Sequence, residues 1–186
     1  TFIPQVVASS RPVVRVWSAA CSTGEEPYTI AMVMSKYLVE PYGIPVKILA
    51  TDIDTNVLKA AARGVYDSHA IGQVPEKYLK KYFLRGKGDS FGLFKVKDDI
   101  RSMVTFKQLN FIAPEYPITA TFDIIFCRNV IIYFSPETKK QVVGKLFRYL
   151  SEGGYIMMGH SETLFNMIEG LVYLKNTVYQ KRIMDK

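Results

Sequence analysis

Short hydrophobic runs alternate with amphipathic segments along the first third of the chain. Residues 13–17 form a run rich in β-branched and aromatic side chains, which suits a buried strand. Apolar residues then recur at helical spacing through residues 28–38, and residues 46–50 form a second apolar run. Another helix is expected over residues 55–63, with Gly64 following its last residue. Strand, helix, strand and helix joined by short links predict a parallel sheet with right-handed crossovers.

The pattern changes between residues 65 and 110. A short amphipathic helix is predicted over residues 75–83, and a glycine-punctuated stretch after it predicts short antiparallel strands. We interpret this region as a small antiparallel excursion from the parallel sheet, and residues 104–109 as the strand that rejoins it.

Regular patterning returns in the last third. Residues 122–127 read as a buried strand, and Ser135 is expected to cap a helix that Gly153–Gly154 ends. A further strand is predicted at residues 155–158 and a terminal antiparallel hairpin at residues 171–181. The pattern therefore predicts an α/β fold with a parallel sheet and a terminal antiparallel hairpin. Residues 1–11 are weakly patterned and are interpreted as the tail of a preceding segment.

Composition narrows the class of partner. The 186 residues include 24 basic and 17 acidic side chains, a net charge of +7. This balance favours an acidic partner, such as nucleic acid, an anionic membrane surface or a carboxylate-rich protein, unless it is simply a solvated basic surface. No apolar run approaches the roughly 20 residues needed to span a bilayer, so no membrane insertion is expected. Two cysteines and two histidines, far apart, predict no disulfide framework, no metal site and a reducing, cytoplasmic location.

Candidate chemistry follows the predicted strands. Residues 18–26, Asp52, residues 110–111 and residues 128–133 each come directly after an apolar run. Ligands of open α/β sheets bind at the carboxyl ends of the strands, so we expect these stretches to lie together.

Asp52 follows the second strand at the separation from the first loop at which a carboxylate accepts hydrogen bonds from ribose hydroxyls. The alternative is that it only terminates the strand, as Asp54 is expected only to cap the next helix. The first loop has Gly24 alone in place of the GxGxxG spacing, which disfavours a dinucleotide and an NAD-dependent dehydrogenase. Glu25 and Glu26 would repel a pyrophosphate, although they could also simply complement the helix dipole. A ligand with ribose, adenine and a cationic amino-acid tail fits better, and S-adenosylmethionine (SAM) is such a ligand.

Five stretches together resemble the CheR family of chemotaxis receptor methyltransferases. They are WSAACSTGEEPYTIA at residues 17–31, ATDIDTNVLKAAARGVY at 50–66, FKQLNF at 106–111, FCRNVIIYF at 126–134 and GHSE at 159–162. They occur in the family's order and span nearly the whole chain. Family members also carry an N-terminal helical domain and a TNxTxFFR-like segment, which this sequence lacks, so contacts from that segment are left unassigned.

The resemblance implies a class I SAM-dependent methyltransferase domain, Rossmann-like with a mainly parallel sheet, over residues 1–186, with a β-subdomain inserted at about residues 67–106. It implies an enzyme, a protein-glutamate O-methyltransferase, that methylates glutamate side chains on the cytoplasmic helices of chemoreceptors and releases S-adenosylhomocysteine. In some members of the family the β-subdomain docks a receptor's C-terminal peptide by strand addition.

The resemblance also gives roles to matching positions. Glu25 or Glu26 would hold the methionine part of SAM, and Asp52 its ribose. The other implied cofactor contacts are Ala19, Gly24, Asn110, Phe111, Arg128 and Asn129. Tyr133 would lie near the transferred methyl group and, with Arg128, is the candidate for catalysis, although Tyr133 could equally be an aromatic packing residue.

Two rival functions remain. A nucleic-acid methyltransferase fits the basic charge, but an enzyme of that kind that methylates amino groups would carry a [DN]PPY-like motif where this chain has CRNVIIYF. A non-catalytic module that binds receptor or cofactor is the other, since the upstream segment is missing.

Overall fold

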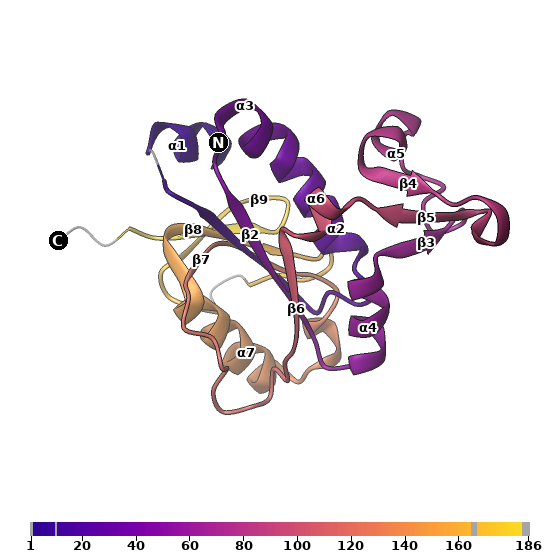
Figure 1. Ribbon diagram of the computed structural model, residues 1–186. Helices are drawn as coiled ribbons and strands as arrows, with labels where there is room; N and C mark the ends of the chain where they lie inside the picture. The colour runs from indigo at the N-terminus through magenta and orange to yellow at the C-terminus, as the bar shows by residue number, and fades with distance from the viewer. Residues whose placement is uncertain (1, 10, 165–166, 184–186) are drawn as a thin grey trace.

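The computed structural model describes residues 2–9, 11–164 and 167–183. Within them, a seven-stranded sheet has the order β6-β2-β1-β7-β8-β10-β9 (Figure 1). Neighbouring strands from β6 to β8 run parallel, whereas β10 is antiparallel to both β8 and β9. The strand bounds are β1 Val14–Ala19, β2 Val46–Asp52, β6 Val104–Gln108, β7 Phe122–Cys127, β8 Leu150–Met158, β9 Leu171–Lys175 and β10 Val178–Lys181.

Helices cover both faces of this sheet and enclose two hydrophobic cores. One core joins β1 and β2 to the helices of the first half of the chain, and Val16, Leu38 and Ile100 are buried in it. The other lies under α7, where Trp17 and Leu146 are buried. The helices are α1 Phe2–Ala8, α2 Glu25–Met34, α3 Glu40–Tyr42, α4 Thr55–Arg63, α6 Asp98–Arg101, α7 Pro136–Tyr149 and the 3-10 turn η3 Ile131–Tyr133. No helix in the described ranges is both long and apolar enough to cross a bilayer.

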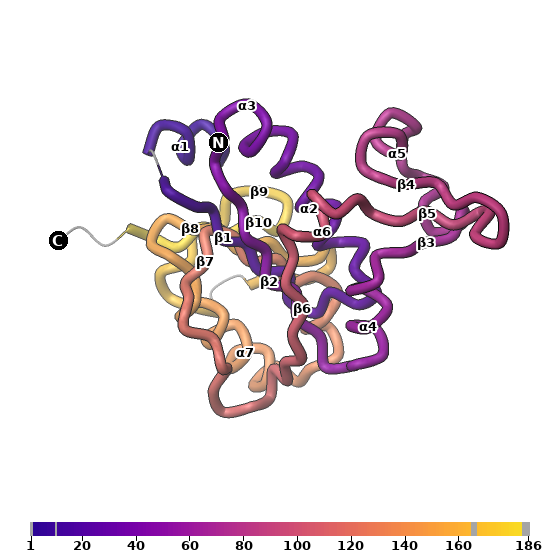
Figure 2. Tube along the Cα trace, in the orientation of Figure 1, coloured from indigo at the N-terminus to yellow at the C-terminus, as the bar shows by residue number. Residues whose placement is uncertain are grey.

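A second, three-stranded antiparallel sheet projects from the body beyond α2 and α4 (Figure 1). Its order is β3-β5-β4, with β3 Val65–Asp67, β4 Phe83–Arg85 and β5 Leu93–Val96. Helix α5 Glu76–Tyr82 precedes β4, and the 3-10 turn η2 Gly88–Ser90 lies between β4 and β5. The chain trace in Figure 2 leaves the body after α4 and returns through α6 to β6.

Most elements expected from the sequence are confirmed. Helix α4 has the predicted bounds, Asp54 caps it by accepting a hydrogen bond from the amide of Asn56, and Gly64 follows it at φ 60°. The predicted return of residues 104–109 is confirmed because β6 pairs with β2. The mainly parallel sheet, the terminal hairpin and the inserted antiparallel sheet are all present.

One helix was not expected, and the end of another was placed wrongly. Residues 2–8, which are weakly patterned in the sequence, form helix α1, in which Val6 is buried and the Phe2 ring packs edge-on against Tyr155. The helix after Ser135 ends at Tyr149 and not at Gly153–Gly154. Those glycines lie inside β8, where a Cβ at Gly154 would come within 2.8 Å of the carbonyl oxygen of residue 151 and the pairing with β7 shifts its register.

The first predicted helix contains a π-helical segment that its sequence pattern does not indicate. Residues 25–42 are helical throughout, but Ser35–Val39 forms the π-helix η1 between α2 and α3. Gly43, at φ 65°, ends this long helix. The π segment supports a contact with α5, since Lys36 of η1 donates a hydrogen bond to the hydroxyl of Tyr78.

Candidate active site

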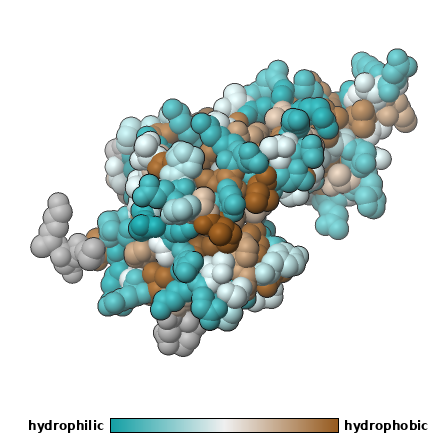
Figure 3. All heavy atoms as spheres, turned by 90° about the horizontal axis from the view of Figure 1, so that it is seen from below, coloured by the Kyte–Doolittle hydropathy of each residue, from teal (hydrophilic) through white to brown (hydrophobic). Residues whose placement is uncertain are grey.

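Four neighbouring strands bring the four predicted stretches to one edge of the sheet. Ala19 at the end of β1 is paired with Thr51 of β2 on one side and with Cys127 of β7 on the other. Asp52 at the end of β2 is paired with Gln108 of β6. Figure 3 views the molecule from the side on which these strands end, and hydrophobic atoms gather in the middle of that face, surrounded by hydrophilic ones.

The loop between β1 and α2 is folded tightly onto the end of β2. The amide of Cys21 donates to the carbonyl of Thr51 at 2.8 Å. Ala20, Ser22 and Gly24 have positive φ angles of 64°, 48° and 97°. Glycine is required at position 24, because a Cβ there would lie 2.9 Å from the Cβ of Ala61. This close packing leaves a small-residue loop whose backbone a ligand can approach.

Asp52 fixes the loop from the neighbouring strand. Its Oδ2 accepts a hydrogen bond of 2.8 Å from the amide of Ser22, and its Oδ1 accepts one of 3.1 Å from the amide of Asp54. Each carboxylate oxygen can accept a second hydrogen bond. The half-buried carboxylate therefore keeps acceptor capacity for a pair of hydroxyls.

Glu26, in the first turn of α2, points its carboxylate across the end of β1. Ser18 donates a hydrogen bond of 2.8 Å to Oε1, and Arg128 of the β7 loop lies 3.5 Å from Oε2. The side chain is 23% exposed, and burial raises the pKa of its carboxyl above the ordinary value, against the effects of Ser18 and Arg128. The carboxylate is thus partly desolvated and has Arg128 at the long end of ion-pair distance, an environment that suits a cationic ligand group.

Glu25 lies in a different environment. It is exposed, and both oxygens of its carboxylate accept from the hydroxyl of Thr23. Of the two glutamates that the sequence left open, only Glu26 has its carboxylate on the strand-end side with Ser18 and Arg128.

The thiols of the two cysteines are buried at the same edge and are free. Burial, with added repulsion from Asp52 and Glu26, raises the pKa of the Cys21 thiol to about 12. Burial also raises the pKa of the Cys127 thiol. Both thiols are therefore neutral at pH 7 and unsuited to nucleophilic chemistry. Among the described residues no group of three or more His, Cys, Asp and Glu side chains could hold a metal.

The end of β6 supplies Asn110 and Phe111. Asn110 is exposed, and its side-chain oxygen accepts from the amide of Ile112. The Phe111 ring is buried in the second core against Tyr116, so little of its surface is available to a ligand. Ile53 and Ile112, which sequence reasoning passed over, are 61% and 56% exposed at this side of the edge.

The end of β7 supplies Arg128, Asn129 and Tyr133. Arg128 and Asn129 are exposed, and Asn129 has a positive φ of 58°. Tyr133 is 82% exposed at the end of η3, so it is free of the packing role that the sequence left possible. The structure thus brings Arg128 into contact with Glu26 and leaves Tyr133 directed to solvent.

Glu162 holds this β7 loop in place, a role that sequence reasoning did not assign. It is buried, its Oε2 accepts from the amides of Gly159 and Asn129, and its Oε1 accepts from those of Val130 and Ile131. A Cβ at Gly159 would lie 2.6 Å from Oε2. The sequence does indicate such a role. Glu162, the last residue of the GHSE motif, lies between apolar stretches, and a buried carboxylate there needs hydrogen-bond partners.

These groups fit an adenosine that carries a cationic amino-acid tail. Asp52 offers acceptors for the ribose, and Glu26 offers a carboxylate for an ammonium. The two carboxylates at the start of α2 place negative charge where a pyrophosphate would need positive charge.

Residues 2–179 match the family described as the CheR methyltransferase, SAM binding domain. The chain belongs to this family.

Curated relatives agree with the match to the CheR family. The chain is 41% identical over 178 residues to the chemotaxis protein methyltransferase of Borreliella burgdorferi, covering 95% of this chain and 62% of the relative. It is 40% identical to chemotaxis protein methyltransferase 2 of Pseudomonas aeruginosa, covering 89% and 59%. The chain thus spans about three fifths of the length of these two relatives.

Solved structures agree on the fold. The N-methyltransferase NodS from Bradyrhizobium japonicum, solved with S-adenosyl-L-homocysteine, superposes with a TM-score of 0.52 at 9% identity. The superposition covers 97% of this chain and 84% of NodS. The predicted class I SAM-methyltransferase fold is therefore confirmed.

Proposed function

We propose that this chain is the catalytic part of a protein-glutamate O-methyltransferase that acts on the cytoplasmic helices of chemoreceptors. The observation that carries the proposal is the meeting of Asp52, Glu26 and Arg128 at one strand edge in a member of the CheR family. The names of the curated relatives indicate methylation in chemotaxis, and the motif resemblance to the CheR family supplies the receptor glutamates as substrate. The proposed location is the cytoplasm, where those receptor helices lie.

The proposed cofactor is SAM. Glu26, oriented by Ser18, holds the ammonium of its methionine part, and Asp52 accepts hydrogen bonds from its ribose hydroxyls. The backbone of Ala19 and Gly24 allows close approach on one side. Asn110 and Phe111 lie beside the adenine, with the exposed Ile53 and Ile112 available for its faces. Arg128 and Asn129 follow β7 on the other side of β1 and are proposed to contact the cofactor from there.

When bound, SAM supplies a methyl group on a positively charged sulfonium. The substrate carboxylate, with a pKa of about 4.3 when unperturbed, is already ionised at pH 7, so no side chain is needed as a general base. The chain's contribution is then to align the carboxylate oxygen with the methyl carbon and to exclude water. Arg128 attracts the carboxylate, and the exposed hydroxyl of Tyr133 orients it by a hydrogen bond.

The projecting small sheet is proposed to dock a receptor's C-terminal peptide. Strands β3 and β4 are both edge strands, and each pairs with β5 alone. Leu84 on β4 and Phe91 beyond η2 are 53% and 85% exposed, which gives an added strand apolar contacts. Phe91→Ala should weaken the binding of such a peptide and leave cofactor binding unchanged.

Transfer of a labelled methyl group tests the reaction. The chain is incubated with methyl-labelled SAM and a chemoreceptor cytoplasmic fragment, and the product is treated with mild base. Label that enters the fragment and is released as methanol is expected, because esters hydrolyse where methylated amines do not. Label that enters duplex DNA or RNA would instead favour the nucleic-acid enzyme.

Cofactor binding separates an enzyme from a binding module. Titration calorimetry should detect S-adenosylhomocysteine binding that is lost in Asp52→Ala, with no binding of NAD. Binding without transfer to any receptor fragment would contradict the proposed activity.

A further inference from the structure

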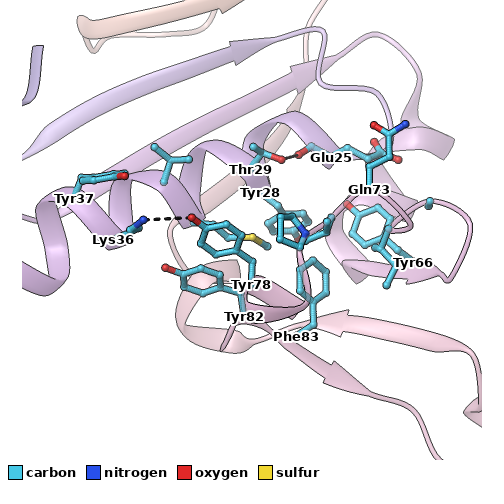
Figure 4. A pocket seen from close by; sticks show the side chains of 16 residues that line it. Glu25, Tyr28, Thr29, Lys36, Tyr37, Tyr66, Gln73, Tyr78, Tyr82 and Phe83 are labelled. Carbon is cyan, nitrogen blue, oxygen red and sulfur yellow. Dashed lines mark hydrogen bonds between the residues drawn. The ribbon is translucent and has the colours of Figure 1, made fainter. Parts of the chain in front are cut away.

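A groove separates α2 from the inserted segment. One wall is formed by α2 and η1, including Met32, Val33 and Tyr37, and the other by residues 66–83, including Ile71, Tyr78 and Phe83. Its volume is about 420 Å³, and Figure 4 shows the aromatic rings facing α2 across it. We call it the α2–α5 groove. Val33 and Tyr37, on a helix that otherwise packs on the sheet, are 45% and 46% exposed.

Lysines without an acidic partner lie at the far end of the groove. Lys36 donates to the hydroxyl of Tyr78, and Lys77 lies 5.1 Å from the centre of the same ring. Neither takes part in an ion pair within the described ranges. The other two lysines of α5 are neutralised, Lys80 by Glu76 and Lys81 by Glu40. The rim at this end is therefore positively charged beside an apolar floor.

The shape of the groove suits a helix better than a small molecule. Residues 25–37 of the α2 wall contribute side chains at each helical turn, a length of about 18 Å at 1.5 Å per residue. The charged groups of the lining lie at its two ends, Glu25 at one and Lys36 at the other, and do not converge on a central point as they do in small-ligand sites. A row of apolar side chains three and four residues apart would fill such a trough.

The groove also leads to the proposed active site. Glu25 lines its near end and is adjacent in sequence to Glu26. Tyr66 in its wall donates a hydrogen bond to the carbonyl of Thr23 in the loop between β1 and α2. A helix lying in the groove would therefore reach the strand edge at that end.

We propose that the α2–α5 groove binds an amphipathic helix of the substrate, with apolar side chains in the trough and glutamates against Lys36 and Lys77. This inference rests on the proposed function, because it is there that the substrate is a glutamate-bearing helix. The inference adds to the proposed function a surface that selects the substrate helix. This surface is separate from the residues proposed to bind SAM and to orient the substrate carboxylate.

Fluorescence anisotropy with the full chain tests the groove. The probe is a labelled synthetic helix of about 20 residues with leucines on one face and glutamates beside them. Lys36→Glu with Lys77→Glu should weaken binding by about tenfold or more, because two attractions become repulsions. Val33→Glu should also weaken it. Lys140→Glu, an exposed change on α7 at the other face of the sheet, is the matched control and should have no effect.

A charge-swapped probe completes the test. A helix with lysines in place of the glutamates should bind the doubly reversed variant more tightly than the unmodified chain. Equal binding by all variants, loss with Lys140→Glu alone, or no binding by the unmodified chain would overturn the inference. Binding that depends on Val33 but not on the two lysines would overturn the choice of an acidic partner.

Cofactor titration of the same samples separates this inference from the function on which it rests. The groove variants should bind S-adenosylhomocysteine as the unmodified chain does. If the unmodified chain binds no S-adenosylhomocysteine, the proposed function fails. If cofactor binding and receptor methylation are intact and the groove variants methylate receptor fragments with unchanged KM, only the groove is wrong.

Discussion

The phenol of Tyr66 donates a hydrogen bond of 2.9 Å to the backbone carbonyl of Thr23, and this bond joins the projecting sheet to the loop between β1 and α2. The Tyr66 ring also packs edge-on against Tyr28 of α2. The same hydroxyl lies 3.0 Å from where a Cβ on Gly24 would be. Burial raises the pKa of this phenol, so it remains a donor across the physiological pH range. The position of the loop thus depends directly on β3.

Replacing Tyr66 by phenylalanine should loosen the loop without removing the ring. The lost hydrogen bond should lower the free energy of unfolding by about 1 kcal/mol, as measured by urea denaturation. Affinity for S-adenosylhomocysteine should fall severalfold, because the loop is no longer preorganised. Tyr42→Phe, at a 55% exposed position at the end of α3, should change neither quantity. Unchanged affinity in Tyr66→Phe would mean that the sheet and the loop are independent.

Asp52 and Asp54 form a matched pair for testing the ribose contact. Asp52→Asn replaces one acceptor oxygen by a donor opposite the amide of Ser22 or Asp54, and should weaken S-adenosylhomocysteine binding by roughly tenfold or more. Asp54→Asn should bind normally, because asparagine caps a helix as well as aspartate does. Calorimetry on both variants measures the difference. Equal losses would point to a general effect of charge at this edge.

The strand-end sites could be predicted because parallel strands end at one edge whatever their packing. Asp52 follows a recognisable β-branched run, and its neighbour Asp54 caps the next helix as expected. The sequence could not choose between Glu25 and Glu26, since both lie in the first turn of α2. The choice depends on Ser18 and Arg128, and Arg128 is 102 residues away in sequence from Glu26.

Other features depend on contacts that no local pattern records. Helix α1 forms where Val6 is buried in the first core and Phe2 packs against Tyr155 of β8. Gly153–Gly154 lie at an irregularity of the β7–β8 pairing rather than at a helix end. The four amides around Glu162 belong to two loops that meet only in the folded chain. The motif marked the residue, but its role required the geometry.

Glu162→Gln should be strongly destabilising. An amide has one acceptor oxygen, so whichever way it faces, two of the four amides that now donate to the carboxylate would meet an NH2 group. Buried donors without acceptors cost about 1–3 kcal/mol each, so the loss of two acceptors should lower the free energy of unfolding by about 2–6 kcal/mol in urea denaturation. Glu115→Gln, at an exposed position, should stay within about 0.5 kcal/mol. A loss of that small size in Glu162→Gln would show that the loop is held by other contacts.

The ionised carboxylate of Glu26 is expected to lower the stability of the unliganded chain and, at the same time, to favour binding of the cofactor. Burial raises the pKa of its carboxyl in the folded chain above the ordinary value of 4.5. A group with a raised pKa favours folding while it is protonated in both states, and this contribution is lost as the pH rises through the folded pKa. At pH 7 the ionised carboxylate therefore costs the unliganded chain stability. Glu26→Gln, which is neutral and can still accept from Ser18, removes that cost.

The variant should therefore melt at a higher temperature than the unmodified chain at pH 7, and the gap should close as the pH falls below 4.5. Its affinity for S-adenosylhomocysteine should fall by roughly tenfold or more, because the ligand ammonium loses its anionic partner. Glu25→Gln is the adjacent control and should bind normally, since its carboxylate faces Thr23 and solvent. Thermal melts from pH 4 to pH 8, paired with calorimetry at pH 7, measure both effects. If Glu26→Gln were less stable at pH 7 and bound normally, Glu26 would be a structural partner of Arg128 and not a ligand group.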